Sequence, residues 1–163
     1  MKKILFISTG GTFNKHYNPE TGLIDIDQQA STLQEIAHKW RTKLNIITII
    51  GKDSLDIDED DRVLLLDAIR ESEFRDIIII HGTDTMDQSA KKIYAANIDK
   101  RIVFAGAMTP YRVDKVEATA NIAMAYGFLQ ADIDNGVYIS MNGVIGEFDK
   151  VIKNRETKRF ESL

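Results

Sequence analysis

The sequence predicts a single α/β domain, a three-layer, doubly wound fold with a mostly parallel sheet of at least five strands. Short runs of apolar, often β-branched residues alternate along the chain with segments whose apolar residues recur at helical spacing. This alternation is typical of βαβ units. Several of the runs are apolar throughout, as expected for strands covered by helices on both faces. A length of 163 residues suits one domain with one sizeable core.

Five apolar runs have the length and composition of strands, and four other segments carry a helical stripe. The expected strands are residues 4–7, 46–50, 77–80, 101–105 and 137–141. The expected helices lie near residues 33–40, 58–69, 88–97 and 122–129. In the second helix, Val63, Leu66 and Ile69 have the spacing of an inward face, with Leu65 at its margin.

Two segments lack a clear period. Residues 14–27 are polar, and a loop of this length in a small domain is often a lid. A hairpin near Gly22 would fit this segment. Residues 142–163 mix short apolar pairs with charges, which is compatible with a hairpin or an irregular arm.

Composition and charge make several classes of partner improbable. The net charge is −4 and no basic patch stands out, so we expect no nucleic-acid partner. The chain has no cysteine, which rules out disulfides and thiolate metal sites and fits a reducing compartment. The N-terminal apolar stretch ends at Ser8, too short for a signal peptide, and no run approaches a membrane span. We therefore expect a cytoplasmic protein with no membrane partner, metal or other cofactor.

The turn after the third expected strand, His81-Gly82-Thr83-Asp84-Thr85-Met86, is the first candidate site. It carries hydroxyls and a carboxylate between a buried strand and the start of a helix. In open α/β sheets, ligands bind at the carboxyl ends of the strands. A structural interpretation is also open, because Thr85 and Gln88 have the spacing of a helix capping box. His81, at the strand end, is more often a structural residue than a ligand.

Other strand-end turns strengthen this candidate site. They are Thr9-Gly10-Gly11-Thr12, Asp53-Ser54 and Gly106-Ala107-Met108-Thr109-Pro110. Because parallel strands end at the same edge of a sheet, all these turns should converge. Paired glycines let a backbone approach a ligand closely, although two glycines alone are weak evidence. The glycine turn is neither G-x-G-x-x-G nor a P-loop, which makes a nucleotide-binding domain a distant alternative.

These turns together resemble the signature segments of bacterial-type L-asparaginases. Thr9-Gly10-Gly11-Thr12 and the stretch from His81 to Met86 match the two signatures in order and separation. Asp53-Ser54 resembles the segment that supplies a substrate-binding serine, and residues 106–110 resemble the family's G-A-M-R-P turn. The match extends to the Phe160-x-Ser162 ending. It implies that residues 1–163 are the family's N-terminal domain and that its smaller C-terminal domain is absent.

The resemblance implies a role for each matched residue. Thr12 would be the nucleophile that attacks the side-chain amide of L-asparagine, with L-glutamine as a further substrate to consider. Ammonia would leave, and water would then release aspartate. Thr83 and Asp84 would form a second group, which a lysine completes in the family. The residues implied in substrate binding are Gly11, Asp53, Ser54, Gly82, Asp84, Ala107 and Met108.

Two matched positions depart from the family's pattern. A loop tyrosine assists the nucleophile in the family, but Leu23 stands at the aligned position, and Tyr17 is the nearest tyrosine that could take this role. The family's lysine lies on the helix after the position matched by Asn121. Counting from Asn121 leads to Asp132, and counting back from Gly136 leads to Gln130, so neither matched position holds a lysine.

Four replacements for that lysine are conceivable: Lys115, Lys15, Lys52, or a water held by Thr83 and Asp84. We expect the water, together with slow turnover, because Lys115 lies between acidic residues at a helix start.

Three functions from different classes remain open. The first is an amidohydrolase acting on L-asparagine. The second is an amino-acid-binding module with weak or no catalysis, which the apparent loss of the lysine favours. The third is an amidase subunit that needs a second polypeptide. For the enzyme we expect a homodimer or larger assembly, because the resemblance implies pockets closed by a neighbouring subunit and cyclic dimers are the commonest assemblies.

Overall fold

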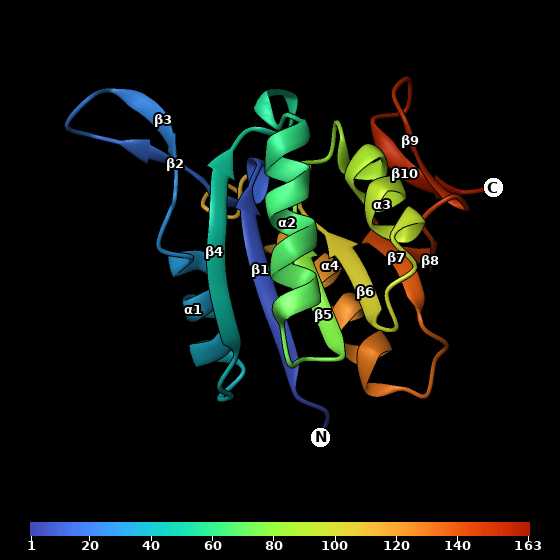
Figure 1. Ribbon diagram of the computed structural model, residues 1–163. Helices are drawn as coiled ribbons and strands as arrows, with labels where there is room; N and C mark the ends of the chain where they lie inside the picture. The colour runs from blue at the N-terminus through green and yellow to red at the C-terminus, as the bar shows by residue number, and fades with distance from the viewer.

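A six-stranded sheet forms the centre of the computed structural model, which describes residues 1–163 (Figure 1). The strands follow the order β4-β1-β5-β6-β7-β8, in which the first five are parallel and β8 is antiparallel to β7. Their bounds are β1 Ile4–Gly10, β4 Asn45–Lys52, β5 Asp76–Ile80, β6 Arg101–Ala105, β7 Gly136–Met141 and β8 Val144–Glu147. The predicted fold class and all five predicted strands are confirmed.

Two helices cover each face of this sheet, which makes the three predicted layers (Figure 1). Helices α2 and α3 lie on one face, and α1 and α4 on the other. Their bounds are α1 Ser31–Lys39, α2 Glu59–Glu71, α3 Met86–Ala95 and α4 Lys115–Gln130. All four isoleucines of β5 are fully buried, and they alternate between the two core clusters. An uninterrupted apolar run is therefore what this central position requires.

The inward face of α2 differs from the prediction. Val63, predicted to face inward, is 41% exposed, whereas Leu65, predicted at the margin, is buried. The buried stripe of α2 consists of Arg62, Leu65, Leu66 and Ile69. Its first member is an arginine. Apolar residues alone therefore indicate a stripe that begins one position too late, at Val63.

The strand order contains a switch point beside β1. The chain passes from β1 to β4 on one side, and all later strands of the sheet add on the other side, next to β5. In open α/β sheets, the crevice at such a point is the usual ligand site. The turns that follow β1, β4 and β5 all lie there.

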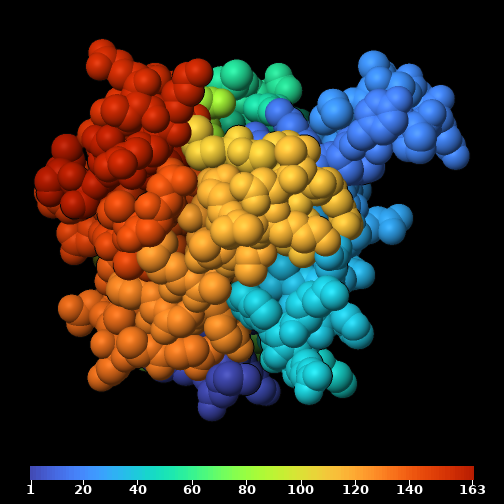
Figure 2. Space-filling model, turned by 180° about the vertical axis from the view of Figure 1, so that it is seen from behind, coloured from blue at the N-terminus to red at the C-terminus, as the bar shows by residue number.

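Two small antiparallel hairpins extend from the main sheet. Strands β2 (Lys15–Asn18) and β3 (Leu23–Ile26) form the hairpin expected near Gly22. It stands clear of the body, as the separate blue lobe in Figure 2 shows. Strands β9 (Val151–Asn154) and β10 (Arg159–Ser162) form the C-terminal hairpin, which packs near β8 (Figure 1). None of the helices has the length and apolar character needed to cross a bilayer.

Candidate active site

Three strand-end turns touch at the switch point. A Cβ added to Gly11 would lie 2.5 Å from the Gly82 Cα, and a Cβ added to Gly82 would lie 2.5 Å from the Ser54 Cβ. Both contacts are too short for any side chain, so glycine is required for the turns to meet. Gly11 also has a φ of +75°, a conformation that favours glycine. As predicted, the turns that carry Thr12, Ser54 and Thr83 lie at one edge of the sheet.

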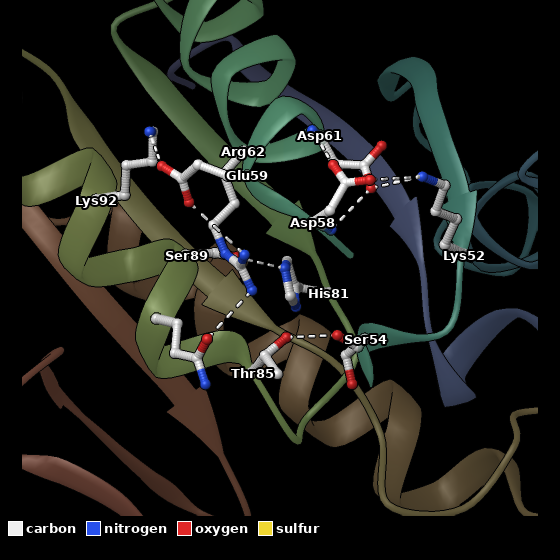
Figure 3. A network of polar contacts seen from close by, with 11 residues as sticks. Lys52, Ser54, Asp58, Glu59, Asp61, Arg62, His81, Thr85, Ser89 and Lys92 are labelled. Atoms are coloured by element: carbon white, nitrogen blue, oxygen red, sulfur yellow. Dashed lines mark hydrogen bonds and ion pairs between the residues drawn. The ribbon is translucent and has the colours of Figure 1, made fainter. Parts of the chain in front are cut away.

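Hydrogen bonds fasten the β4 turn to the β5 turn. The Asp84 N–H donates to the Ser54 hydroxyl at 3.2 Å. The Thr85 hydroxyl donates to the Ser54 carbonyl at 2.7 Å (Figure 3). Thr85 is the N-cap of α3 but makes no side-chain cap bond. The predicted capping box with Gln88 is therefore wrong, because the Thr85 hydroxyl is used to join two turns. The preceding helix α2, by contrast, begins with a true capping box, made by Asp58 and Asp61.

A lysine completes the Thr83–Asp84 group. The Lys153 Nζ donates to the Thr83 Oγ1 at 2.8 Å and to the Asp84 Oδ1 at 2.8 Å. Lys153 reaches the turn from β9, and its side chain is 16% exposed. The expectation that no lysine remains, and that a water replaces it, is therefore wrong. The positions expected for the lysine lie near the end of α4, whereas the lysine comes from the C-terminal hairpin.

The other side chains considered at or in place of that lysine have partners elsewhere in the chain. Lys115 pairs with Glu35 at 2.5 Å, and Lys52 pairs with Asp61 at 2.7 Å. Gln130, at the end of α4, accepts a hydrogen bond from the backbone of the N-terminal segment. None of these three side chains joins the Thr83–Asp84 group.

Lys15, the remaining candidate, lies in β2 and forms an ion pair with Asp53. The hydrogen bond from Lys15 holds the pKa of the Asp53 carboxyl below its usual range, although burial acts in the opposite direction. Asp53 also caps the short 3₁₀ helix Ser54–Asp56 through the Leu55 N–H. This aspartate is thus already paired within the chain.

The nucleophile candidate occupies a more open position. Thr12 begins the 3₁₀ helix Thr12–Asn14 and is partly exposed, and its carbonyl accepts from the Lys15 N–H. Tyr17 and Leu23, which follow it on the projecting hairpin, are 61% and 64% exposed. Tyr17 lies across from Ile24, so the structure holds this tyrosine on the hairpin, which stands clear of the body.

The turn after β6 is held by a carboxylate that sequence reasoning missed. The Met108 and Thr109 N–H groups donate to Glu117 of α4, at 2.9 and 3.0 Å. One turn further along α4, Asn121 donates to the Gly106 carbonyl at 3.0 Å. Ala107, between these anchored residues, is 1% exposed. The signal for this anchor was present in the sequence, since Glu117 and Asn121 stand four residues apart, on one side of a helix.

His81 lies beneath the signature turn in a chain of polar contacts (Figure 3). Its Nδ1 donates to the Gly82 carbonyl, and its Nε2 accepts from the Ser89 hydroxyl, both at 2.8 Å. The Arg62 Nε in turn donates to the Ser89 Oγ at 3.3 Å. Burial lowers the pKa of His81 to about 4, so the ring is neutral near pH 7. The chain of contacts explains why α2 buries an arginine.

A cleft of about 300 Å³ adjoins the lysine group. It is lined by Thr83, Asp84, Asp87, Lys91, Phe148, Asp149, Val151, Ile152, Lys153, Arg155 and Phe160. Thr12 and Ser54 are not part of its lining, so the structure places them at the same edge but outside this cleft. No group of three or more His, Asp or Glu side chains is arranged to hold a metal ion.

The sequence of this edge matches a known family. The family described as "Asparaginase, N-terminal" matches residues 3–162 of this chain. The chain belongs to the asparaginase family. The resemblance inferred from the signature turns is therefore confirmed over nearly the whole chain.

Individual relatives fall into two groups. The L-asparaginase of Thermococcus kodakarensis is 28% identical over 170 residues, covering 99% of this chain and 48% of that protein. A glutamyl-tRNA(Gln) amidotransferase subunit from Methanococcus maripaludis is 29% identical over 156 residues, covering 90% of this chain and 36% of that protein.

Solved structures support the same fold. The thermostable L-asparaginase from Thermococcus kodakarensis superimposes with a TM-score of 0.86 at 26% identity, covering 99% of this chain and 51% of that chain. The probable cytoplasmic L-asparaginase from Campylobacter jejuni gives a TM-score of 0.82 at 22% identity, covering 99% and 52%. This chain thus spans about half the length of the asparaginases it matches.

Proposed function

We propose that this chain is an amidohydrolase that cleaves the side-chain amide of L-asparagine through Thr12, with L-glutamine as a secondary substrate. One observation carries the proposal. The Lys153 ammonium lies within hydrogen-bond distance of both Thr83 and Asp84, at the sheet edge where Thr12 also lies. Membership of a family that includes L-asparaginases supports the assignment of amide chemistry.

The reaction would proceed in two steps. The Thr12 hydroxyl oxygen attacks the amide carbon, so that a C–O ester bond forms and the C–N bond breaks. The hydroxyl proton passes to the departing nitrogen, which leaves as ammonia. In the second step, a water attacks the ester carbon, one of its protons returns to the Thr12 oxygen, and L-aspartate is released.

Lys153 and Thr83 supply the proton path in this proposal. A threonine hydroxyl is a weak nucleophile and needs a proton acceptor nearby. The Thr83 oxygen accepts from Lys153 through one lone pair, so its second lone pair can take the Thr12 proton while the Thr83 hydrogen is donated to the departing nitrogen. Asp84 holds the lysine in position, and the contact between Gly11 and Gly82 keeps this group beside Thr12.

Some backbone groups near the site are unavailable to substrate. The Gly11 N–H donates to the Lys52 carbonyl at 2.9 Å, and the Met108 N–H is engaged by Glu117. We therefore assign Gly11 and Met108 a structural role at this edge of the sheet, in which their N–H groups do not bind substrate. The Thr12 N–H, at the first position of its 3₁₀ helix, is not used by that helix, and we propose it as a donor to the developing oxyanion.

We also propose that a second copy of the chain covers the site. Thr12 is partly exposed and its hairpin stands clear of the body, and a site open to water loses electrostatic stabilisation. Cyclic dimers are the commonest assemblies of soluble proteins, and a partner copy could cover this edge. Light scattering at micromolar concentration should give the mass of a dimer. A monomer that still turns over substrate would refute the dimer.

Ammonia release from purified chain with L-asparagine and L-glutamine tests the function. Thr12→Ala should lose activity by on the order of 10³-fold, as expected when a covalent nucleophile is removed. Thr21→Ala, at the tip of the same hairpin, is the matched control and should keep activity. Wild-type turnover in Thr12→Ala would assign the nucleophile to another residue.

A second candidate function is an amidase component that works with a partner chain. The match to the glutamyl-tRNA(Gln) amidotransferase favours it, because that relative is itself one subunit of its enzyme. The same assay separates the two functions, because a component of this kind would release ammonia only when its partner is added.

A further inference from the structure

The C-terminal hairpin that carries Lys153 is tied to the rest of the fold by a backbone group of its second strand. The Phe160 N–H donates to the Asn142 Oδ1 at 3.0 Å. Phe160 lies directly opposite Lys153 in the register of β9 and β10, and its side chain packs into the core on the α2 and α3 face of the sheet. Besides the contacts that Lys153 and Arg155 make with the signature turn, this bond is the polar link between the hairpin and the main sheet.

Asn142 is held in turn by two residues of α4. Its N–H donates to the Asn121 Oδ1 at 2.8 Å, and its Nδ2 donates to the Glu117 Oε1 at 3.4 Å. Asn121 and Glu117 also hold the turn after β6. One polar cluster on α4 therefore fixes the turn that contains Ala107 and, through Asn142, the hairpin that contains Lys153.

The backbone conformation of Asn142 has an ordinary structural explanation. Asn142 and Gly143 join β7 to β8 with φ values of +51° and +82°, and Asn-Gly is a favoured pair for a two-residue hairpin turn. Glycine fits such a turn equally well, so the turn itself does not require the side-chain bonds to Phe160 and Glu117. Those bonds are a separate property of the asparagine.

We propose that Asn142 is a positioning residue for the reaction, which sets the place of Lys153 by holding the strand opposite it. The inference rests on the proposed amidohydrolase function, in which Lys153 contacts Thr83. A two-stranded hairpin is marginally stable by itself, so the position of β9 depends on its anchors. Release of the Phe160 N–H lets β10 and β9 shift together, and a displacement of about 1 Å at a reacting group can slow a reaction by about 10²-fold.

Asn142→Gly tests the role of the side chain, because it keeps a residue suited to the turn. The value of kcat for L-asparagine should fall by on the order of tenfold with little change in KM, since Lys153 serves proton transfer and the Phe160 ring still holds part of the hairpin. Asn97→Gly is the matched control, because Asn97 has a similar φ of +50° and its side chain makes no hydrogen bond. Asn142→Asp keeps an acceptor for the Phe160 N–H and should recover part of the lost rate.

A double-mutant cycle with Lys153→Met separates positioning from a general loss of structure. Because Asn142 acts through Lys153 in this proposal, Asn142→Gly should add little further loss to Lys153→Met. The same fold loss in both backgrounds, or a wild-type kcat in Asn142→Gly, overturns the inference and leaves the amidohydrolase standing.

Amide hydrogen exchange at Phe160 gives a readout that does not need turnover. Its N–H should exchange about tenfold faster in Asn142→Gly than in wild type or Asn97→Gly. Equal exchange rates would show that Asn142 does not anchor the hairpin, and the inference would be wrong. If wild-type chain releases no ammonia from either amide, the proposed function falls, and this inference falls with it.

Discussion

The two hydroxyl groups of the site lie in different surroundings. Thr83 is 7% exposed, and its oxygen accepts a hydrogen bond from Lys153 at 2.8 Å. The lysine is held in turn by Asp84, and the whole turn is tied to Ser54. Thr12, by contrast, is partly exposed and precedes a hairpin whose Tyr17 is 61% exposed. One half of the site is assembled within the chain, and the other is open.

The difference shows which half of the site is complete within the fold and which half needs a further element to cover it. The Thr83 half combines segments from β4, β5 and β9, so its geometry follows from the fold itself. The Thr12 half has its backbone fixed by the glycine contact, but its outer side lacks a cover. We expect changes in the Thr83 half to act on chemistry directly, and changes in the hairpin to act more weakly.

The largest effect is expected for Lys153→Met. This change removes the donor to Thr83 and the counter-charge of Asp84 but keeps the length of the side chain. The value of kcat should fall by on the order of 10³-fold, within the range for a proton-transfer group. Lys115→Met is the control, because Lys115 pairs with Glu35 away from the site, and it should change activity by less than about tenfold, or 1.4 kcal/mol. Equal losses in both variants would remove Lys153 from the mechanism.

The next effect concerns His81 beneath the Thr83 turn. Its folded pKa of about 4 lies below the value of about 6.5 for an unfolded histidine. The unfolded state therefore binds more protons between these values, so stability is full above about pH 6.5 and falls as pH drops toward 4. The loss should reach about 3 kcal/mol.

Urea unfolding from about pH 4.5 to 7.5 measures this dependence. His81→Gln should flatten the change in unfolding free energy over that range, whereas His38→Gln, on α1 and away from the site, should leave it as in wild type. An unchanged slope in His81→Gln would show that other groups cause the dependence.

A pair of glycine variants sharpens the comparison at the level of packing. Gly11 and Gly22 both have positive φ, +75° and +73°, but only Gly11 meets another backbone. Gly11 also has a ψ of −177°, a region that residues other than glycine hardly adopt, so backbone strain and the contact with Gly82 both make alanine costly there. Gly11→Ala should destabilise the chain by about 2 kcal/mol more than Gly22→Ala. Equal unfolding free energies would mean that the two turns separate easily.

The smallest effect is expected for Tyr17→Phe. If the hairpin folds over Thr12 during turnover, loss of this hydroxyl should lower kcat by about tenfold, or 1.4 kcal/mol. Tyr94→Phe, at an exposed position on α3, is the control and should have no effect. A wild-type rate in Tyr17→Phe would show that the Tyr17 hydroxyl does not assist Thr12 during turnover.

Sequence patterns predicted the fold well because burial on both faces leaves a strong signal. The four isoleucines of β5 form an unbroken apolar run, and polar or glycine-rich turn residues follow each strand. The same patterns located Thr12, Ser54, Thr83 and Asp84 at one edge, since parallel strands must end together.

The residues that were missed have two different physical causes. Lys153 lies in a strand of four residues, where Val151 is buried, Ile152 is exposed and the lysine turns inward again. This alternation was present in the sequence, but a strand of only four residues gives a weak signal. Arg62 and Glu117 were missed because both are polar residues on inward-facing helix positions, which a hydrophobic stripe does not reveal.

A double-mutant cycle of Thr83→Val and Lys153→Met tests most directly whether the assembled half acts as one unit. Ammonia release from L-asparagine is measured for wild type, both single variants and the double variant. Residues that act together give non-additive losses. The structure therefore predicts that the double variant loses about as much activity as either single variant alone. If the two losses simply multiply, Thr83 and Lys153 act independently, and the proposed proton path through their hydrogen bond is wrong.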